Sequence, residues 1–387
     1  MIGLPPFLSF SENERILQLK TLMIILRTVK NISSLNIAAS VLLFLAAILA
    51  AVVANSSLSP VYQDFLLQEL HLRIGNFNLF SHGGHPLKMI EFINDCLMTV
   101  FFLAVGLEIK RELLVGELSS VRKAALPFIA ACGGMVVPVV IYALSVASGT
   151  PETRGMAIPM ATDIAFSLGV LSLLGKRVPL SLKIFLTAFA VVDDIGGILV
   201  IALFYSADVA YGYLIAAAVL YVFLYYMGKF GVTQKIFFLF FGVIIWYLFL
   251  QSGIHSTISG VILAFVIPAR PRLDAGKYIE RIRDIIGEFP VSKSDNIVLT
   301  NAQIATLKQV ERASDYVISP LQSLEDNLHG AVSFVILPLF AFANAGVVFS
   351  GSGSIVGDVS IAVAAGLLLG KFLGVYPFCL LYTSPSP

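Results

Sequence analysis

Two adjacent carboxylates, Asp193 and Asp194, interrupt the otherwise apolar stretch VVDDIGGILV. Asp163 and Lys371 each lie near the middle of another apolar stretch. A charged side chain at the centre of a membrane-spanning helix costs about 2.5–3.5 kcal/mol, so four of them cost on the order of 10 kcal/mol. That sum is comparable with the roughly 5–15 kcal/mol that stabilises a whole domain. We therefore expect these four side chains to serve a function beyond packing.

The chemistry that suits such a cluster is the binding of a small cation. Carboxylate oxygens are hard ligands, and two adjacent carboxylates in a low-dielectric site cannot both stay ionised cheaply. Their titrations are coupled, so protons and a monovalent cation compete for the same oxygens. If the site opens to each side of a membrane in turn, this competition produces cation/proton exchange. Because successive residues lie about 100° apart around a helix, one aspartate can face the ion while the other faces Lys371.

Other interpretations explain less of the pattern. A buried ion pair that only fixes the register of two helices accounts for Lys371 and one aspartate, but not for the remaining carboxylates. Asp163 and Asp193 could form the dyad of an intramembrane aspartyl protease, in which two carboxylates share a proton. The chain lacks the YD and GxGD patterns of such enzymes. A membrane scaffold without transport activity would not explain the cost of the buried charges.

The composition is that of a membrane protein. Hydrophobic residues make up 58% of the 387 residues and charged residues only 13%, whereas a soluble domain has about a quarter charged residues. The formal net charge of +1 gives no reason to expect a nucleic-acid partner. Apolar runs near the roughly 20 residues that a helix needs to cross a bilayer predict ten spans. They cover about residues 37–56, 89–109, 124–146, 154–175, 179–205, 208–228, 235–250, 254–269, 331–349 and 358–381.

Lys and Arg are concentrated in every second connection between these runs, which predicts a cytoplasmic N-terminus and a multi-pass protein surrounded by lipid. The polar stretch between the eighth and ninth spans is partly periodic, as in YIERIRDII, and predicts amphipathic helices. The expected organisation is a cytoplasmic segment at 1–36, eight spans within 37–269, a cytoplasmic insert at 270–330, two spans within 331–381, and a tail at 382–387.

Two short segments predict local structure. HLRIGNFNLF alternates apolar and polar residues around Gly75-Asn76, which is typical of a β-hairpin near 71–80. In AIPMATDIAFSLG, Pro159 removes a backbone donor, while Thr162 and Asp163 are residue types that begin a new helix. We expect the fourth span to be interrupted near 159–163, although a simple proline kink is the alternative. Irregular backbone at membrane depth lines a cavity or is buried in protein, so the interruption and the aspartates should share one site.

Small residues would let these elements approach one another. Gly196 and Gly197 follow the aspartate pair, and Gly366, Gly370 and Gly374 recur every four residues around Lys371. Such spacing predicts a closely packed helix face.

Several long motifs together resemble the bacterial NhaA-type Na⁺/H⁺ antiporters over about residues 37–381, apart from the polar insert. The motifs are NDCLMTVFFLAVGLEIKREL, AIPMATDIAFSLGVLSLLG, VVDDIGGILVIALFY, QSGIHSTISGVI, LPLFAFANAGV and AGLLLGKFLG. Transporters of this type have inverted repeats with broken helices and an ion site at the midplane of the membrane. The resemblance implies the same architecture for this chain. The resemblance implies an all-α polytopic protein with about ten of twelve expected spans, a broken fourth helix and a periplasmic hairpin.

The resemblance also assigns roles to individual residues. It implies that Asp194 is the principal Na⁺ or Li⁺ ligand, that Asp193 takes part and pairs with Lys371, and that Asp163 with Thr162 compensates the helix ends at the interruption. No cofactor and no enzymatic activity are expected, since Na⁺ or Li⁺ and H⁺ are the transported ions.

Regulation and assembly follow from the same resemblance. Glu108, Arg111, Glu112 and Glu325 would form a cytoplasmic mouth that senses pH. His255, which titrates near neutrality, is a further candidate for a pH response at the outer end of a span. The hairpin would form a homodimer, and the protein would lie in the bacterial inner membrane.

The chain departs from the family at its end. After Leu381 it continues as YTSPSP, whereas the family continues through two further spans. We therefore expect a truncated antiporter with a non-native tail, and an inactive fragment is the alternative to an active exchanger.

Overall fold

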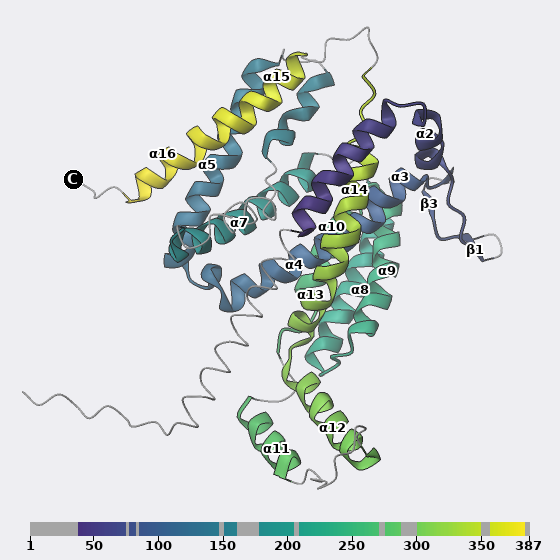
Figure 1. The fold of residues 1–387 in the computed structure, drawn as a ribbon, viewed down its shortest axis with the longest axis vertical. Coiled ribbons are helices and arrows are strands. Elements are labelled where there is room, and N and C mark those ends of the chain that lie inside the picture. Colours follow the sequence, from purple (N-terminus) through teal and green to yellow (C-terminus); the bar gives the residue numbers. More distant parts are fainter. Residues whose placement is uncertain are drawn as a thin grey trace, which may run out of the picture.

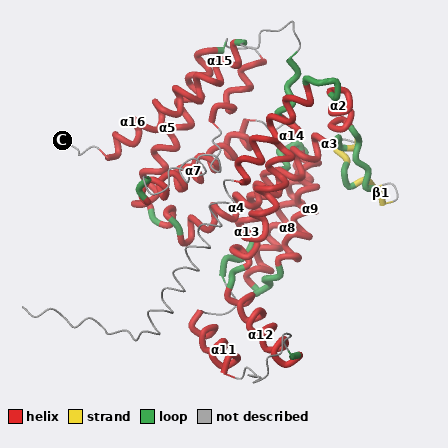
Figure 2. Tube along the Cα trace, in the orientation of Figure 1, coloured by secondary structure: helices red, strands yellow, loops and turns green. Residues whose placement is uncertain are grey.

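The computed structural model describes residues 38–74, 77–82, 85–146, 151–160, 178–204, 209–270, 275–287, 300–349 and 357–383. Helices dominate these parts of the chain (Figures 1 and 2). Six of the described helices are long and apolar enough to cross a membrane, or seven if the bent pair Ala38–Ala54 and Ser59–Leu67 (α2) counts as one. The structure thus confirms a helical, multi-pass type of protein, while the expected count of ten or twelve spans stays a prediction.

One group of helices is centred on the crossing of α4 and α10. A Cβ atom on Gly106 of α4 would lie 2.8 Å from the Cβ of Ala264, and one on Gly260 of α10 would collide with the carbonyl of Thr99. Glycine at both positions therefore lets the two helices touch. The helical elements of this group are α3 (Met89–Phe92), η1 (Ile93–Leu97), α4 (Met98–Val115), α8 (Tyr211–Lys229), α9 (Lys235–Ser252), α10 (Thr257–Val266), α13 (Pro320–Ala331), η5 (Val332–Ile336) and α14 (Leu337–Asn344).

A second group carries the buried charges. Its elements are α5 (Val121–Ser145), η3 (Pro151–Met160), α7 (Leu180–Phe204), α15 (Asp358–Ala365), η6 (Gly366–Gly370) and α16 (Lys371–Thr383). Figure 1 shows α15 and α16 lying along α5. A Cβ on Gly374 would collide with the backbone of Gly133, and one on Gly370 would lie 2.6 Å from the Cα of Pro138. These approaches confirm the predicted close-packed face around Lys371.

Contacts between α4 and α7 join the two groups, and the 3₁₀ turn η2 (Glu117–Ser119) lies between α4 and α5. The buried side chains of α7, from Ala188 to Val192, pack with those of α5 directly before the aspartate pair.

Three π-helical segments, η1, η5 and η6, interrupt spans that the sequence predicted as regular helices. A π-helical turn inserts an extra residue into the hydrogen-bonding ladder and is frequent at functional sites. Here η6 ends directly before Lys371, and η1 contains Asp95.

The predicted hairpin is present. Strand β1 (Arg73–Ile74) pairs antiparallel with β2 (Phe77–Asn78), with Ile74 opposite Phe77. A second hairpin, β3 (Ser81–His82) with β4 (His85–Pro86), follows directly and was not predicted.

Some helix limits differ from the expected ones. The helix of the ninth span begins at Pro320 rather than near residue 331, because the Ser319 hydroxyl accepts the amide of Gln322 as an N-cap. The insert contains α11 (Ala275–Gly287) and α12 (Asn301–Val317). In the expected eighth span, α10 has 10 residues and is about 15 Å long, shorter than a bilayer core.

Candidate ion-binding site

Lys371 and Asp193 form a buried ion pair between α16 and α7. The Lys371 ammonium lies 2.8 Å from Oδ2 and 3.1 Å from Oδ1 of Asp193, so it donates to both carboxylate oxygens. The exposed fraction is 2% for the Asp193 side chain and 17% for Lys371. A pair of this kind compensates two charges that could not be buried separately.

Phe189 also contacts this ammonium. Its ring centroid lies 5.9 Å from the Lys371 nitrogen, within the range of a cation–π interaction. Phe189 precedes Asp193 by one helical turn, so both side chains lie on the same face of α7. The spacing of Phe189 and Asp193 could have indicated this contact, but sequence reasoning missed it because aromatic residues are common in apolar spans.

Asp194 lies in a different environment from its neighbour. It is only partly buried, while Asp193 belongs to the buried core. A Cβ on Gly196 would collide with the sulfur of Met135 in α5, whereas one on Gly197, one turn after Asp194, would meet none of the described atoms within 4 Å. The helix therefore packs tightly against α5 on the Gly196 side and less tightly on the Gly197 side.

The segment that leads to Thr162 and Asp163 packs against η6, which ends directly before Lys371. Pro159 in η3 is fully buried, and a Cβ on Gly366 would lie 2.8 Å from the Cβ of Pro159. Thr162 and Asp163 themselves lie outside the described residues, as does most of the predicted interruption.

The four residues expected at the cytoplasmic mouth form one cluster between α4 and α13. The Arg111 Nε donates to Oε1 of Glu325 at 3.0 Å, and its Nη1 lies 3.4 Å from Oε1 of Glu112. Glu108, one turn before Glu112, lies within electrostatic range of Arg111 and Glu325. The other oxygen of Glu112 accepts the backbone amide of Glu117 at 3.0 Å. The structure therefore brings these residues together, and their role in sensing pH stays a prediction.

Comparison with known proteins shows to which family the chain belongs. The sequence model of the Na⁺/H⁺ antiporter 1 family matches residues 30–385. The chain belongs to this family. A Na⁺/H⁺ antiporter NhaA of Bacteroides thetaiotaomicron is 76% identical over 356 residues, which cover 92% of this chain and 81% of the relative. The corresponding proteins of Bacteroides fragilis and Parabacteroides distasonis are 74% and 49% identical, with 82% and 81% of their lengths covered. They cover 92% and 94% of this chain, respectively.

Lys110 has a structural role that was not predicted from the sequence. Its ammonium donates to the carbonyl oxygens of Phe265 at 2.8 Å, Ala264 at 3.4 Å and Ile267. Ala264 and Phe265 belong to the last turn of α10, where their carbonyls have no partners within the helix, and Ile267 follows directly after the helix end. Lys110 therefore fixes the end of α4 that carries Arg111 to the end of α10.

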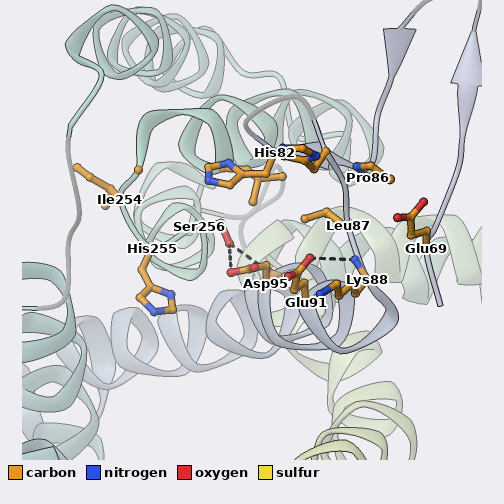
Figure 3. Close-up of a pocket in the computed structure, with 13 residues that line it drawn as sticks. Glu69, His82, Pro86, Leu87, Lys88, Glu91, Asp95, Ile254, His255 and Ser256 are labelled. Atoms are coloured by element: carbon orange, nitrogen blue, oxygen red, sulfur yellow. Dashed lines mark hydrogen bonds between the residues drawn. The ribbon is translucent and has the colours of Figure 1, made fainter. Parts of the chain in front are cut away.

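His255 lies at the opposite end of α4, in a cavity of about 760 Å³ beside the hairpins (Figure 3). The titratable side chains that line this cavity are Glu69, His82, His85, Lys88, Glu91, Asp95 and His255. Asp95 accepts a hydrogen bond from Ser256 at 3.1 Å. Among the described residues, no three His, Cys, Asp or Glu side chains converge to hold a metal ion. The predicted pH-responsive residues of this antiporter-family chain thus occupy both ends of one helix.

Asn344 has the structural role expected of a polar side chain in a span. It donates to Asn94 at 2.8 Å and to the carbonyl of Phe340 at 2.9 Å. This pair joins α14 to η1.

Proposed function

We propose that this chain exchanges Na⁺ or Li⁺ from the cytoplasm for external H⁺, with both ions competing for the aspartate pair of α7. The observation that carries the proposal is that the two aspartates have different environments. Asp193 is held by Lys371 through both carboxylate oxygens, while Asp194, its neighbour on the helix, is only partly buried.

The ion pair explains how one site can bind either ion. Because the Lys371 ammonium occupies both oxygens of Asp193, we assign the cation to the neighbouring carboxylate of Asp194. Na⁺ bound at Asp194 balances the negative charge of this carboxylate, and a proton bound there does the same. Protonation therefore releases Na⁺, and Na⁺ binding releases the proton, without a cofactor.

Transport further requires that the site opens to each side of the membrane in turn. We assign this movement to the architecture that the family resemblance implies, with inverted repeats and a fourth helix interrupted near 159–163. Thr162 and Asp163 would compensate the helix ends at that interruption. The buried Pro159 beside η6 supports a position of this segment next to Lys371.

The surroundings of the site are assigned in the same way. The cluster of Glu108, Arg111, Glu112 and Glu325 would sense cytoplasmic pH, and His255 would respond to pH at the hairpin end. The distribution of Lys and Arg supports a cytoplasmic N-terminus in a bacterial inner membrane. The hairpin of β1 and β2 would join two copies in a homodimer.

An aspartyl protease is less consistent with the site. A protease dyad needs two carboxylates that share a proton. Asp193 instead has both oxygens within 3.1 Å of the Lys371 ammonium. No contact of the described residues favours the protease over the exchanger.

Everted membrane vesicles test the proposed exchange. Addition of Na⁺ should collapse a preformed pH gradient in vesicles that contain the chain, and Asp194→Asn should abolish this response, because the neutral amide can neither attract the cation nor exchange a proton. Asp64→Asn is the matched control, since Asp64 is an exposed residue of α2. A parent chain without Na⁺-dependent collapse, or an Asp194→Asn variant with the parent's response, would overturn the proposal.

A further inference from the structure

Tyr142 places a buried hydroxyl against the backbone of η3. The residue lies in the last turn of α5, and its side chain is fully buried. Its hydroxyl donates to the carbonyl oxygen of Glu152 at 2.7 Å. A Cβ on Gly155 would collide with the same hydroxyl, so the absence of a side chain there lets η3 come this close. The hydroxyl therefore bonds to η3 at Glu152 and lies against it at Gly155.

The packing of the ring alone does not require a tyrosine. The ring of Tyr142 lies in an apolar cluster with Val146, Met156 and Ala362, and phenylalanine would fill the same space. A buried hydroxyl costs free energy unless it is hydrogen-bonded. Because the bond of this hydroxyl goes to η3, it ties the position of η3 to that of α5.

The position of η3 depends on such contacts with its neighbours. This element is a 3₁₀ helix of 10 residues. Runs of 3₁₀ helix longer than three or four residues are uncommon, because their hydrogen-bond geometry is poor. Partners on neighbouring helices therefore contribute much of what holds this segment in place.

The same segment contacts both elements that carry the ion pair. It touches α7, which contains Asp193 and Asp194, and η6, which ends directly before Lys371. Its buried Pro159 fits against Gly366, the first residue of η6, where a Cβ would lie 2.8 Å from the Cβ of Pro159. A displacement of η3 would therefore disturb the spacing of α7 and η6.

We propose that Tyr142 is a positioning residue for cation exchange: its hydroxyl fixes η3, and η3 keeps α7 and η6 at the spacing at which the aspartate pair binds Na⁺ or Li⁺. This inference rests on the proposed exchange, because it assigns a role in that reaction. Tyr142 acts through η3 and not through contact with the cation. Loss of its hydroxyl should therefore weaken cation binding without abolishing it.

Tyr142→Phe tests the hydroxyl, since it keeps the ring and its packing. In everted vesicles the KM for Na⁺ should rise by about two- to tenfold, the range that one hydrogen bond of this kind can supply. The affinity of the purified chain for Li⁺ in detergent, measured by titration calorimetry, should fall by the same factor.

Tyr221→Phe is the matched control. The buried hydroxyl of Tyr221 donates to the carbonyl oxygen of Ser259 at 2.8 Å, within the group of α4 and α10. This variant loses a bond of the same type, so it should lose a similar amount of unfolding stability. Its KM for Na⁺ and its affinity for Li⁺ should stay at the values of the parent chain.

Gly155→Ala perturbs the same contact from the side of η3. The added methyl group would collide with the hydroxyl of Tyr142, so the KM for Na⁺ should again rise. In the double variant Tyr142→Phe, Gly155→Ala the methyl group takes the space that the hydroxyl leaves. The increase in KM should therefore be smaller than the product of the two single increases.

The inference is wrong if Tyr142→Phe keeps the parent's KM for Na⁺ and affinity for Li⁺, or if Tyr221→Phe changes both to the same extent. In either case the proposed exchange would stand. A parent chain without Na⁺-dependent exchange would count against the proposed function instead. The Li⁺ affinities of the purified variants would then still decide whether Tyr142 positions the aspartate pair.

Discussion

Removing the ammonium of Lys371 while keeping Asp193 should strongly destabilise the protein. Lys371→Met retains an unbranched apolar stem but leaves a carboxylate with 2% exposure without its cation. Breaking a buried pair by removing one partner costs about 3–5 kcal/mol. The expected loss lies in that range, because the ammonium contacts both carboxylate oxygens and the Phe189 ring.

The double variant Asp193→Asn, Lys371→Met isolates the pair. Since it leaves no uncompensated charge at this position, its loss of unfolding free energy should be clearly smaller than the sum of the two single losses. Reversible unfolding in mixed detergent micelles, followed by circular dichroism, gives these free energies. Additive single effects would refute this account of the pair.

Other variants test the packing and the ends of α4. Gly374→Ala should destabilise the protein by about 1–3 kcal/mol through overpacking against the α5 backbone, whereas Gly197→Ala, with open space around its Cβ, should be near neutral in the same unfolding assay. Lys110→Ala should lower the free energy of unfolding by about 1–3 kcal/mol, because carbonyls of the last turn of α10 lose a charged donor. Lys123→Ala, which removes an exposed ion pair at the surface, should lower it by less than about 1 kcal/mol. Arg111→Gln should shift the pH dependence of exchange in vesicles, because the ion pair between Arg111 and Glu325 is lost; an unchanged profile would contradict a role of the cluster in pH response.

Two kinds of feature were predictable from the sequence: those that follow from a local residue pattern, and those that follow from the free-energy cost of burying a charge. The hairpin was predicted because alternation around two turn residues specifies it, and Ile74 does lie opposite Phe77. The pairing of Lys371 with an aspartate followed from the cost of leaving either charge alone in a bilayer. The cluster of Arg111 and Glu325 has no local signal, since the two residues lie 214 positions apart. Only the family resemblance indicated it.

Other features depend on tertiary packing or were misread. The π-helical turn before Lys371 is set by how α15 and α16 fit against α5, and apolar periodicity does not distinguish it from regular helix. The start of α13 at Pro320 was not predicted, because the polar residues before position 331 were assigned to the insert. The sequence does contain a signal for this start, since Ser319 is a typical N-cap residue and Pro320 a typical first helical residue. Thr162 and Asp163 lie outside the described residues, so their place in the site stays a prediction.

Helices α4 and α10 are fastened to each other at three levels. The carboxylate of Asp95 accepts from Ser256 just before α10 begins, Gly106 and Gly260 bring the helices into contact, and Lys110 holds the last turn of α10. Sliding or rotation of one helix against the other would break all three connections together. The two helices should therefore move as one unit, and we expect any rearrangement that carries an ion across to displace the group of α5, α7 and α16 relative to them.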